Sequence, residues 1–249
     1  MTPNRLTVTV SLIIINVVVY LVGSVALTPA FLDIAIPGGQ DTPTLQVMGS
    51  YSWFSCFMQG ELWRLISYQF LHANLTHLLF NMWALYFFGR LLESIMSPRR
   101  FLVYYLTCGV AGALFSSILA GMGFYSSVAD TPQAIALANQ LVVQYTEYTG
   151  MVMPWQLVPM IGASAAVYGV MVAIAFMFPH GRIHLLFPPI DLSMRTFALL
   201  IIGIAMLTIL FNLDNAGGEA GHLGGAIMGL LIMTVWKWRI ISRYKRNGL

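Results

Sequence analysis

Long apolar segments with almost no charge dominate this sequence and limit what it can fold into. A helix needs roughly 20 mostly apolar residues to cross a bilayer, and six segments meet this requirement. They are Leu6–Leu27, Leu65–Gly89, Phe101–Gly121, Leu157–Phe178, Thr196–Leu213 and Gly221–Trp238. The composition agrees, because 58% of the residues are hydrophobic and only 8% are charged, against roughly 25% charged in soluble domains. We predict an all-α, multi-pass membrane protein, a six-helix bundle in a single domain over residues 1–249.

The charged residues predict the orientation of this bundle. If the amino terminus is cytoplasmic, 11 of the 12 lysines and arginines lie on the cytoplasmic side and only Arg64 lies outside. Seven of the nine acids then fall outside. Lys and Arg concentrate in the cytoplasmic loops of membrane proteins, so both termini are expected in the cytoplasm. The net charge of +3 thus reflects topology and anionic lipid, and no nucleic-acid partner is predicted.

Two long external loops interrupt the spans, at about residues 28–60 and 122–156. The aromatic run YSWFSCF in the first loop suggests partial burial in the membrane interface. The run TPQAIALANQLVVQYTEY in the second loop predicts a mildly amphipathic surface helix. The membrane core therefore lies at about residues 60–235.

One short stretch, MIGASAAVYG at Met160–Gly169, places a serine inside an apolar span. Ser164 has glycine and alanine as its neighbours, so little bulk surrounds its hydroxyl. Tyr168 follows four residues later on the same helical face. A serine in a membrane helix often serves packing alone. If a histidine from another span reaches this face, Ser164 becomes a candidate nucleophile.

The sixth span begins with such a histidine, His222. Gly225 and Gly229 share its face, and small residues four apart let a neighbouring helix approach closely. Both spans enter from outside and Ser164 is expected about two turns in, so the two groups should lie at a similar shallow depth. The alternative is that His222 caps a helix end and Ser164 only packs. Ionisable groups inside spans are usually functional, which favours a Ser–His pair.

The second span carries HANLTHLLFN, in which His77 and Asn81 lie four apart on one face. Together with the Ser164 backbone N–H, both side chains can donate hydrogen bonds to a developing oxyanion. His72 points to a different part of the surface, where a supporting role or hydrogen bonding to loop backbone is expected.

Other intramembrane chemistries find less support. The HExxH motif of zinc proteases is absent, and no span contains an aspartate. The spacing of His72, His77 and His222 fits no usual metal site. Cys56 and Cys108 form neither a disulfide framework nor a metal-binding pair. We predict no metal and no cofactor.

Together these motifs resemble the rhomboid family of intramembrane serine proteases. The resemblance covers about residues 60–235 and rests on HANLTHLLFN, GASAAVYG and GHLGGAIMG, on the Trp-Arg pair in Glu61-Leu62-Trp63-Arg64, and on Gly89 with Glu93. It implies a six-helix rhomboid-like bundle whose substrates are single-span membrane proteins, cut near the outer membrane boundary.

The resemblance also implies a role for each site residue. Ser164 corresponds to the nucleophile and His222 to the base, in a dyad without a third acid. His77 and Asn81 correspond to oxyanion donors, and Tyr168 to the ring stacked on His222.

Two positions depart from the family pattern: Ala165 replaces a glycine after the serine, and Gly221 replaces an alanine before the histidine. We expect both to be tolerated. The prediction is a serine endopeptidase of the bacterial inner membrane that has transmembrane proteins and the bilayer as partners, with no oligomeric state assigned. One alternative is an inactive relative that binds client transmembrane helices. Another is a solute transporter, although the sequence shows neither the repeated halves nor the broken helices of many transporters.

Overall fold

The computed structural model describes residues 6–23, 44–125, 154–184 and 189–246. The surface helix predicted within residues 126–153 lies outside the described residues. The described chain is mostly helical, and its elements in order are α1 (Val8–Leu21), α3 (Thr44–Gly49), η2 (Phe54–Met58), α4 (Arg64–Ser67), η3 (Tyr68–Phe70), α5 (Leu75–Ala84), η4 (Leu85–Gly89), α6 (Arg90–Ile95), α7 (Pro98–Gly121), η5 (Pro154–Gln156), α9 (Ser164–Met177), β1 (Arg182–His184), β2 (Asp191–Ser193), α10 (Met194–Leu210) and α11 (Ala216–Arg246).

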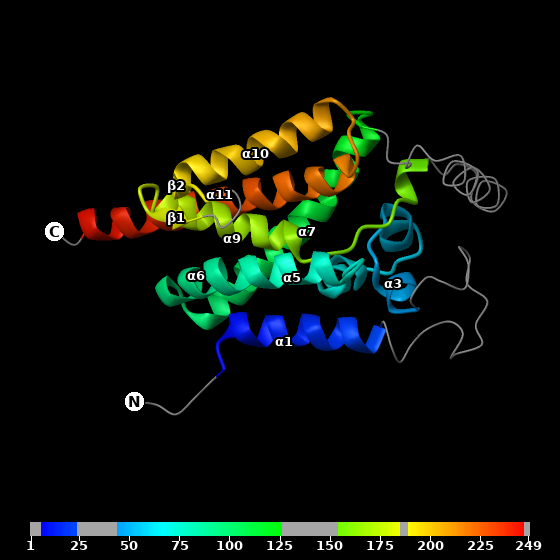
Figure 1. Ribbon diagram of the computed structural model, residues 1–249, viewed down its shortest axis with the longest axis horizontal. Coiled ribbons are helices and arrows are strands. Elements are labelled where there is room, and N and C mark those ends of the chain that lie inside the picture. The colour runs from blue at the N-terminus through cyan, green and yellow to red at the C-terminus, as the bar shows by residue number, and fades with distance from the viewer. Residues whose placement is uncertain (1–5, 24–43, 126–153, 185–188, 247–249) are drawn as a thin grey trace.

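The centre of the bundle is formed by α7, α9 and α11, which pack against one another. Helix α10 covers α11 on one side, and α1 lies at the opposite edge against α5 and α6 (Figure 1). Phe101, Tyr105, Val170 and Ile174 are fully buried between these layers. A short antiparallel pair, β1 with β2, precedes α10. This pair was not predicted, because each strand has only three residues, too few to show a strand periodicity.

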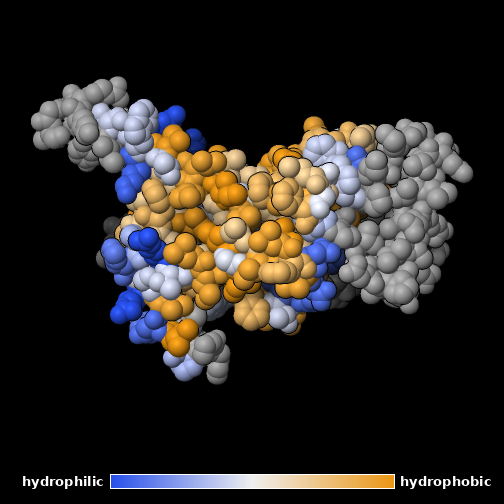
Figure 2. Space-filling model, turned by 90° about the horizontal axis from the view of Figure 1, so that it is seen from above, coloured by the Kyte–Doolittle hydropathy of each residue, from blue (hydrophilic) through white to orange (hydrophobic). Residues whose placement is uncertain are grey.

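The outer surface of the bundle is apolar over a broad band. Figure 2 shows this band between two more hydrophilic ends. Exposed side chains include Val103 at 64%, Leu199 at 61% and Phe80 at 70%. Soluble monomers rarely expose large contiguous apolar patches, so this is an all-α membrane fold. Within the described ranges, two helices are long and apolar enough to cross a bilayer, Pro98–Gly121 and Ala216–Arg239. Helices α1, α9 and α10 are apolar but shorter.

The second apolar segment is not one continuous helix, contrary to the prediction. Short turns over Arg64–Ser67 and Tyr68–Phe70 precede a break, and α5 begins at Leu75. Asn74 caps it, since its side chain accepts a hydrogen bond from the His77 N–H at 2.8 Å. Such a cap replaces the missing intrahelical partner of a first-turn N–H. The helical run then continues through η4 and α6.

The fourth apolar segment becomes helical later than predicted. Helix α9 begins at Ser164 rather than near Leu157. Residues 157–163 are not helical, and Met160 pairs with Tyr51 through backbone hydrogen bonds of 3.0 and 2.7 Å. Burial raises the pKa of Tyr51 to about 12, so its hydroxyl remains neutral beside Ser117. The expectation that Ser164 lies two turns into a helix is wrong. Ser164 is the first residue of α9, and the two turns expected before it are replaced by non-helical chain.

The small-residue faces of α9 and α11 meet directly. A Cβ added to Gly225 would lie 2.0 Å from the Ala165 carbonyl oxygen, and one added to Gly229 would lie 2.8 Å from the Gly169 backbone. No side chain larger than hydrogen fits at these positions without moving a helix. The glycines therefore set the distance between the helix that carries Ser164 and the helix that carries His222.

This packing makes the first testable prediction. The substitution Gly225→Ala should lower the free energy of unfolding by about 1–3 kcal/mol, the usual cost of overpacking, because the obstructing atoms are backbone. The matched control is Gly203→Ala on α10, where nothing lies within 4 Å of the added methyl and alanine favours the helix. Thermal unfolding in detergent measures both variants. Equal melting temperatures for the two variants would contradict the close approach of α9 and α11.

Candidate active site

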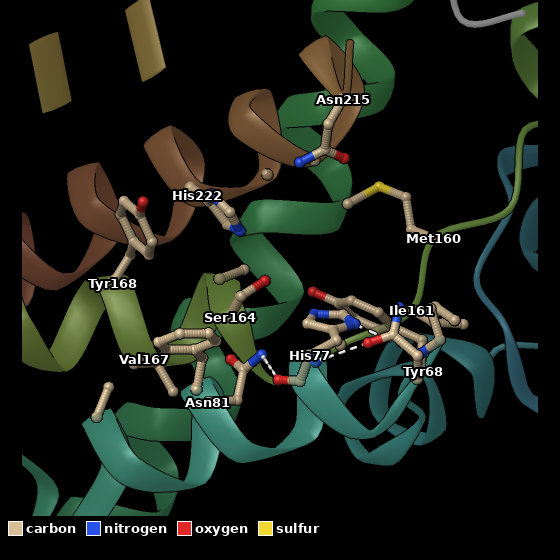
Figure 3. Close-up of a pocket in the computed structure, with 18 of the residues that line it drawn as sticks. Tyr68, His77, Asn81, Met160, Ile161, Ser164, Val167, Tyr168, Asn215 and His222 are labelled. Atoms are coloured by element: carbon tan, nitrogen blue, oxygen red, sulfur yellow. Dashed lines mark hydrogen bonds between the residues drawn. The ribbon is translucent and has the colours of Figure 1, made fainter. Parts of the chain in front are cut away.

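A cavity of about 490 Å³ opens between α5, α9, α11 and the segment before α9. It is lined by all five residues predicted to form the site, which are His77, Asn81, Ser164, Tyr168 and His222. Figure 3 shows the side chains of Ser164, His77 and His222 facing the same space. Of the described residues, no Asp, Glu, Lys or Arg lines the cavity, and no cluster of His, Cys, Asp and Glu is arranged to hold a metal ion.

Ser164 is the first residue of α9, at the helix end where backbone N–H groups lack intrahelical partners. This end of a helix favours negative charge. The chain reaches it through Gly162, whose φ of +126° is strained for any residue with a side chain. A Cβ on Gly162 would lie 2.8 Å from Cε1 of His77 and 3.5 Å from the Ser164 Oγ. Gly162 therefore leaves room for an imidazole beside the serine.

His222 is held from two sides. The Tyr168 ring stacks on its imidazole, with centroids 4.2 Å apart and planes inclined by 13°. On α11 itself, Glu219 places its Oε2 2.9 Å from Nδ1 of His222. The stacking fixes the ring plane and the carboxylate occupies Nδ1, which leaves Nε2 for the cavity. Sequence reasoning counted Glu219 only as an external acid, although its i, i+3 spacing from His222 was a usable signal.

His77 presents a hydrogen-bond donor toward Gly162. Its Nδ1 accepts a hydrogen bond from the Ala73 backbone N–H at 3.4 Å. A neutral imidazole that accepts at Nδ1 carries its proton on Nε2. In the space that a Cβ on Gly162 would occupy, the nearest atoms are Cε1 and Nε2 of His77, at 2.8 and 2.9 Å. The Nε2–H group therefore lies on the side of the ring that faces the serine segment.

Asn81 lies one turn beyond His77 on α5. Its Nδ2 donates to the His77 carbonyl at 2.9 Å (dashed in Figure 3), which uses one of the two N–H groups of the amide and leaves the other for the cavity. His72 does not line the cavity. Its ring is 5.0 Å from that of His77 and only 2% of the residue is exposed. A supporting role for His72 therefore remains a prediction.

The alanine that follows Ser164 fits because another glycine makes room for it. Ala165 is 3% exposed, and a Cβ added to Gly112 on α7 would lie 2.5 Å from the Ala165 Cβ. The methyl group of Ala165 therefore occupies space that Gly112 leaves empty. Gly112 thus makes room for the methyl group that distinguishes this chain from the family pattern.

Some cavity walls were missed by sequence reasoning. The Tyr68 hydroxyl donates to the Gly109 carbonyl at 2.6 Å, which fixes one wall. Asn215 has a φ of +67° and lines the cavity beside His222 (Figure 3). A Cβ on Gly218 would lie 2.3 Å from the Asn215 Oδ1, so the glycine permits this placement. Neither wall residue belongs to a recognisable motif.

Comparison with known proteins yields consistent matches. The rhomboid domain model matches residues 59–239. Rhomboid protease AarA of Providencia stuartii is 26% identical over 233 residues, which are 94% of this chain and 73% of that protein. Rhomboid protease GluP of Bacillus subtilis is 27% identical over 222 residues, which are 85% of this chain and 35% of that protein. The protein named Inactive RHOMBOID-like protein 8 of Arabidopsis thaliana is 32% identical over 106 residues, or 39% and 30% of the two chains.

Coverage of these relatives is unequal. The chain spans about a third of the length of GluP and of the Arabidopsis protein. The matches also include both proteins named as proteases and one named as inactive, so similarity alone leaves open whether this chain cuts peptide bonds.

The contact between Gly162 and His77 generates the second prediction. Gly162→Ala should slow labelling of Ser164 by a fluorophosphonate at least tenfold, because the methyl group would overlap the His77 ring. The control is Gly60→Ala, which also places a methyl group at a positive φ, here +76°, but has nothing within 4 Å of it. Labelling rates and thermal unfolding are measured together. If both variants label at the same rate, the overlap with His77 has no role in serine reactivity.

Proposed function

The chain belongs to the rhomboid family, and from this premise we propose that it is an intramembrane serine endopeptidase acting through Ser164 and His222. The observation that carries the proposal is that both residues line one cavity, although α9 and α11 are far apart in the sequence. The hydroxyl sits at a helix N-terminus, and the imidazole is stacked on Tyr168 with Glu219 at Nδ1 rather than at Nε2.

In the proposed reaction, the Ser164 Oγ forms a bond to the carbonyl carbon of the scissile peptide while its proton passes to Nε2 of His222. The C–N bond then breaks, and the departing amine takes that proton. This leaves an acyl-enzyme on Ser164. A water molecule, deprotonated by His222, attacks the ester and releases the carboxylic acid, and the proton returns to Ser164.

Negative charge builds on the carbonyl oxygen during both additions. We assign its stabilisation to His77, Asn81 and the Ser164 backbone N–H. The Nε2–H of His77 and the remaining N–H of Asn81 support this assignment, because preformed donors need no reorganisation when the charge develops. No cofactor is needed for these steps.

The proposed topology has six spans. The second span is the continuous run α5–η4–α6, and the other five are α1, α7, α9, α10 and α11. Arg90 begins α6, Arg182 begins β1, and Arg195 lies in the first turn of α10. These elements gather with the start of α1 and the end of α11 at one end of the bundle (Figure 1). We propose that this end is cytoplasmic. The bacterial relatives AarA and GluP support a location in the bacterial inner membrane.

We propose single-span membrane proteins as substrates. Phe80 lines the cavity yet is 70% exposed, so the cavity is continuous with the apolar surface of α5. A transmembrane segment can reach the serine from that side without crossing charged surface. Cleavage near the outer membrane boundary follows from the proposed orientation.

The second candidate function is binding of client transmembrane helices without cleavage. It is favoured by the inactive Arabidopsis relative and by Ala165. The room that Gly112 makes for Ala165 and the presence of both Ser164 and His222 favour the protease.

A cleavage assay tests the two candidates. The protein and a model single-span substrate are reconstituted in the same liposomes, and the products are sized by mass spectrometry. The wild type should cut the substrate, while Ser164→Ala and His222→Ala should reduce cleavage to background. Ser94→Ala and His180→Ala are matched controls at exposed positions outside the cavity, and both should retain wild-type cleavage. Binding without cleavage by the wild type would support the client-binding alternative instead.

The oxyanion assignment makes a separate prediction. His77→Ala and Asn81→Ala should each lower kcat by up to about 100–1000-fold and leave KM nearly unchanged, because the lost hydrogen bonds form mainly in the transition state. Leu79→Ala, on the same helix but 58% exposed, serves as the control. A rise in KM at constant kcat would show that these residues hold the substrate instead.

A further inference from the structure

The imidazole of His222 contacts a carboxylate that the dyad does not require. Glu219 and His222 lie three residues apart on α11, and Oε2 of Glu219 is 2.9 Å from Nδ1 of His222. Both side chains are largely buried, with 17% and 14% exposed. Glu219 does not line the cavity, so it reaches the histidine from the side away from the substrate.

This contact determines which nitrogen of His222 carries the proton. An ionised carboxylate only accepts hydrogen bonds, so with Glu219 ionised the donor in this contact is Nδ1 of His222. The lone pair of the neutral ring then lies on Nε2, the nitrogen left for the cavity. The stacked Tyr168 ring, 4.2 Å away, restricts rotation of the imidazole out of this arrangement.

We propose that Glu219 is a positioning residue, which holds His222 in the tautomer able to accept the Ser164 proton and stabilises the imidazolium that results. The inference rests on the proposed protease function. During attack, the proton of Ser164 moves to Nε2 and the Oγ–carbon bond forms. Glu219 stays ionised and receives no proton, as in hydrolases whose histidine is oriented by a buried acid.

The charges around His222 single out Glu219. From α9 the imidazole faces Tyr168 and Ser164, and from α5 it faces His77, which interacts with it electrostatically. Of the described cavity residues, none is an acid or a Lys or Arg. Glu219 is therefore the carboxylate placed to balance the positive charge on His222.

A simpler role must be separated from this one. Glu219 lies in the first turn of α11, where any acid stabilises the helix by interacting with its dipole. That role requires negative charge near the helix end but no contact with Nδ1. The experiments therefore need a readout of the tautomer and of turnover, besides stability.

The first experiment reads the tautomer directly. The protein is labelled with 15N-histidine, and the His222 signals are assigned with His222→Gln. The wild type should show a protonated Nδ1 and a bare Nε2, and Glu219→Ala should increase the population protonated at Nε2. The same spectra are also recorded for Ser164→Ala with and without Glu219→Ala. Because these variants lack the nucleophile, their spectra report the tautomer independently of catalysis. A wild-type ring protonated at Nε2, or a spectrum unchanged by Glu219→Ala, overturns the inference.

The second experiment measures turnover. Glu219→Gln should lower kcat by about 10–100-fold, the range found when the orienting partners of metal-bound histidines are removed. KM should stay unchanged, and the melting temperature should fall only slightly because the helix dipole loses one favourable charge. Glu219→Asp should recover part of the loss of kcat. Asp214→Asn, an exposed acid four residues before Gly218, should match the wild type. Wild-type kcat in Glu219→Gln, or a loss matched by a lower melting temperature without recovery in Glu219→Asp, overturns the inference.

The two proposals fail differently. If Ser164→Ala still cuts the substrate, the protease mechanism is wrong, whatever the tautomer of His222. If Ser164→Ala and His222→Ala abolish cleavage while Glu219→Gln does not lower it, the mechanism stands and the role of Glu219 is wrong.

Discussion

The close approach of α9 and α11 is the constraint on which the site depends. Hydrogen is the only side chain that fits where Gly225 meets the Ala165 carbonyl, and Gly229 meets Gly169 in the same way. In a bilayer, where lipid is as apolar as leucine, such van der Waals contact between backbones is a main source of helix association. The packing that holds the bundle together is therefore also what brings Ser164 and His222 to one cavity.

The second constraint is where α9 begins. A serine inside a continuous helix would have its backbone N–H bonded to the preceding turn. Because the chain before Ser164 is held outside the helix, through Met160 on Tyr51 and Gly162 on the Tyr68 carbonyl, the first N–H groups of α9 stay unbonded within the helix. The same break thus supplies a nucleophile, an adjacent backbone donor and the positive end of a helix dipole.

Much of this could be predicted from sequence, and the misses have physical reasons. Hydropathy and motif spacing located the apolar segments and the five residues that share the cavity. They did not locate the helix ends. The start of α9 depends on backbone hydrogen bonds from Met160 and Gly162 to the distant Tyr51 and Tyr68. The Asn74 cap is instead a local contact with the His77 N–H, a signal in the sequence that hydropathy does not register. Glu219 was missed because its charge was read as a topology signal, whereas its contact with His222 depends on side-chain rotamers. The β1–β2 pair gave no apolar periodicity to detect.

The central claim is that Ser164 is activated within a preformed oxyanion site, and the crystal structure of a fluorophosphonate adduct tests it most directly. The account predicts phosphorus bonded to the Ser164 Oγ, with the phosphoryl oxygen within hydrogen-bond distance of Nε2 of His77, Nδ2 of Asn81 or the Ser164 N–H, and with His222 beside the ester oxygen. An adduct on a different serine, or a phosphoryl oxygen directed away from all three donors, would contradict it.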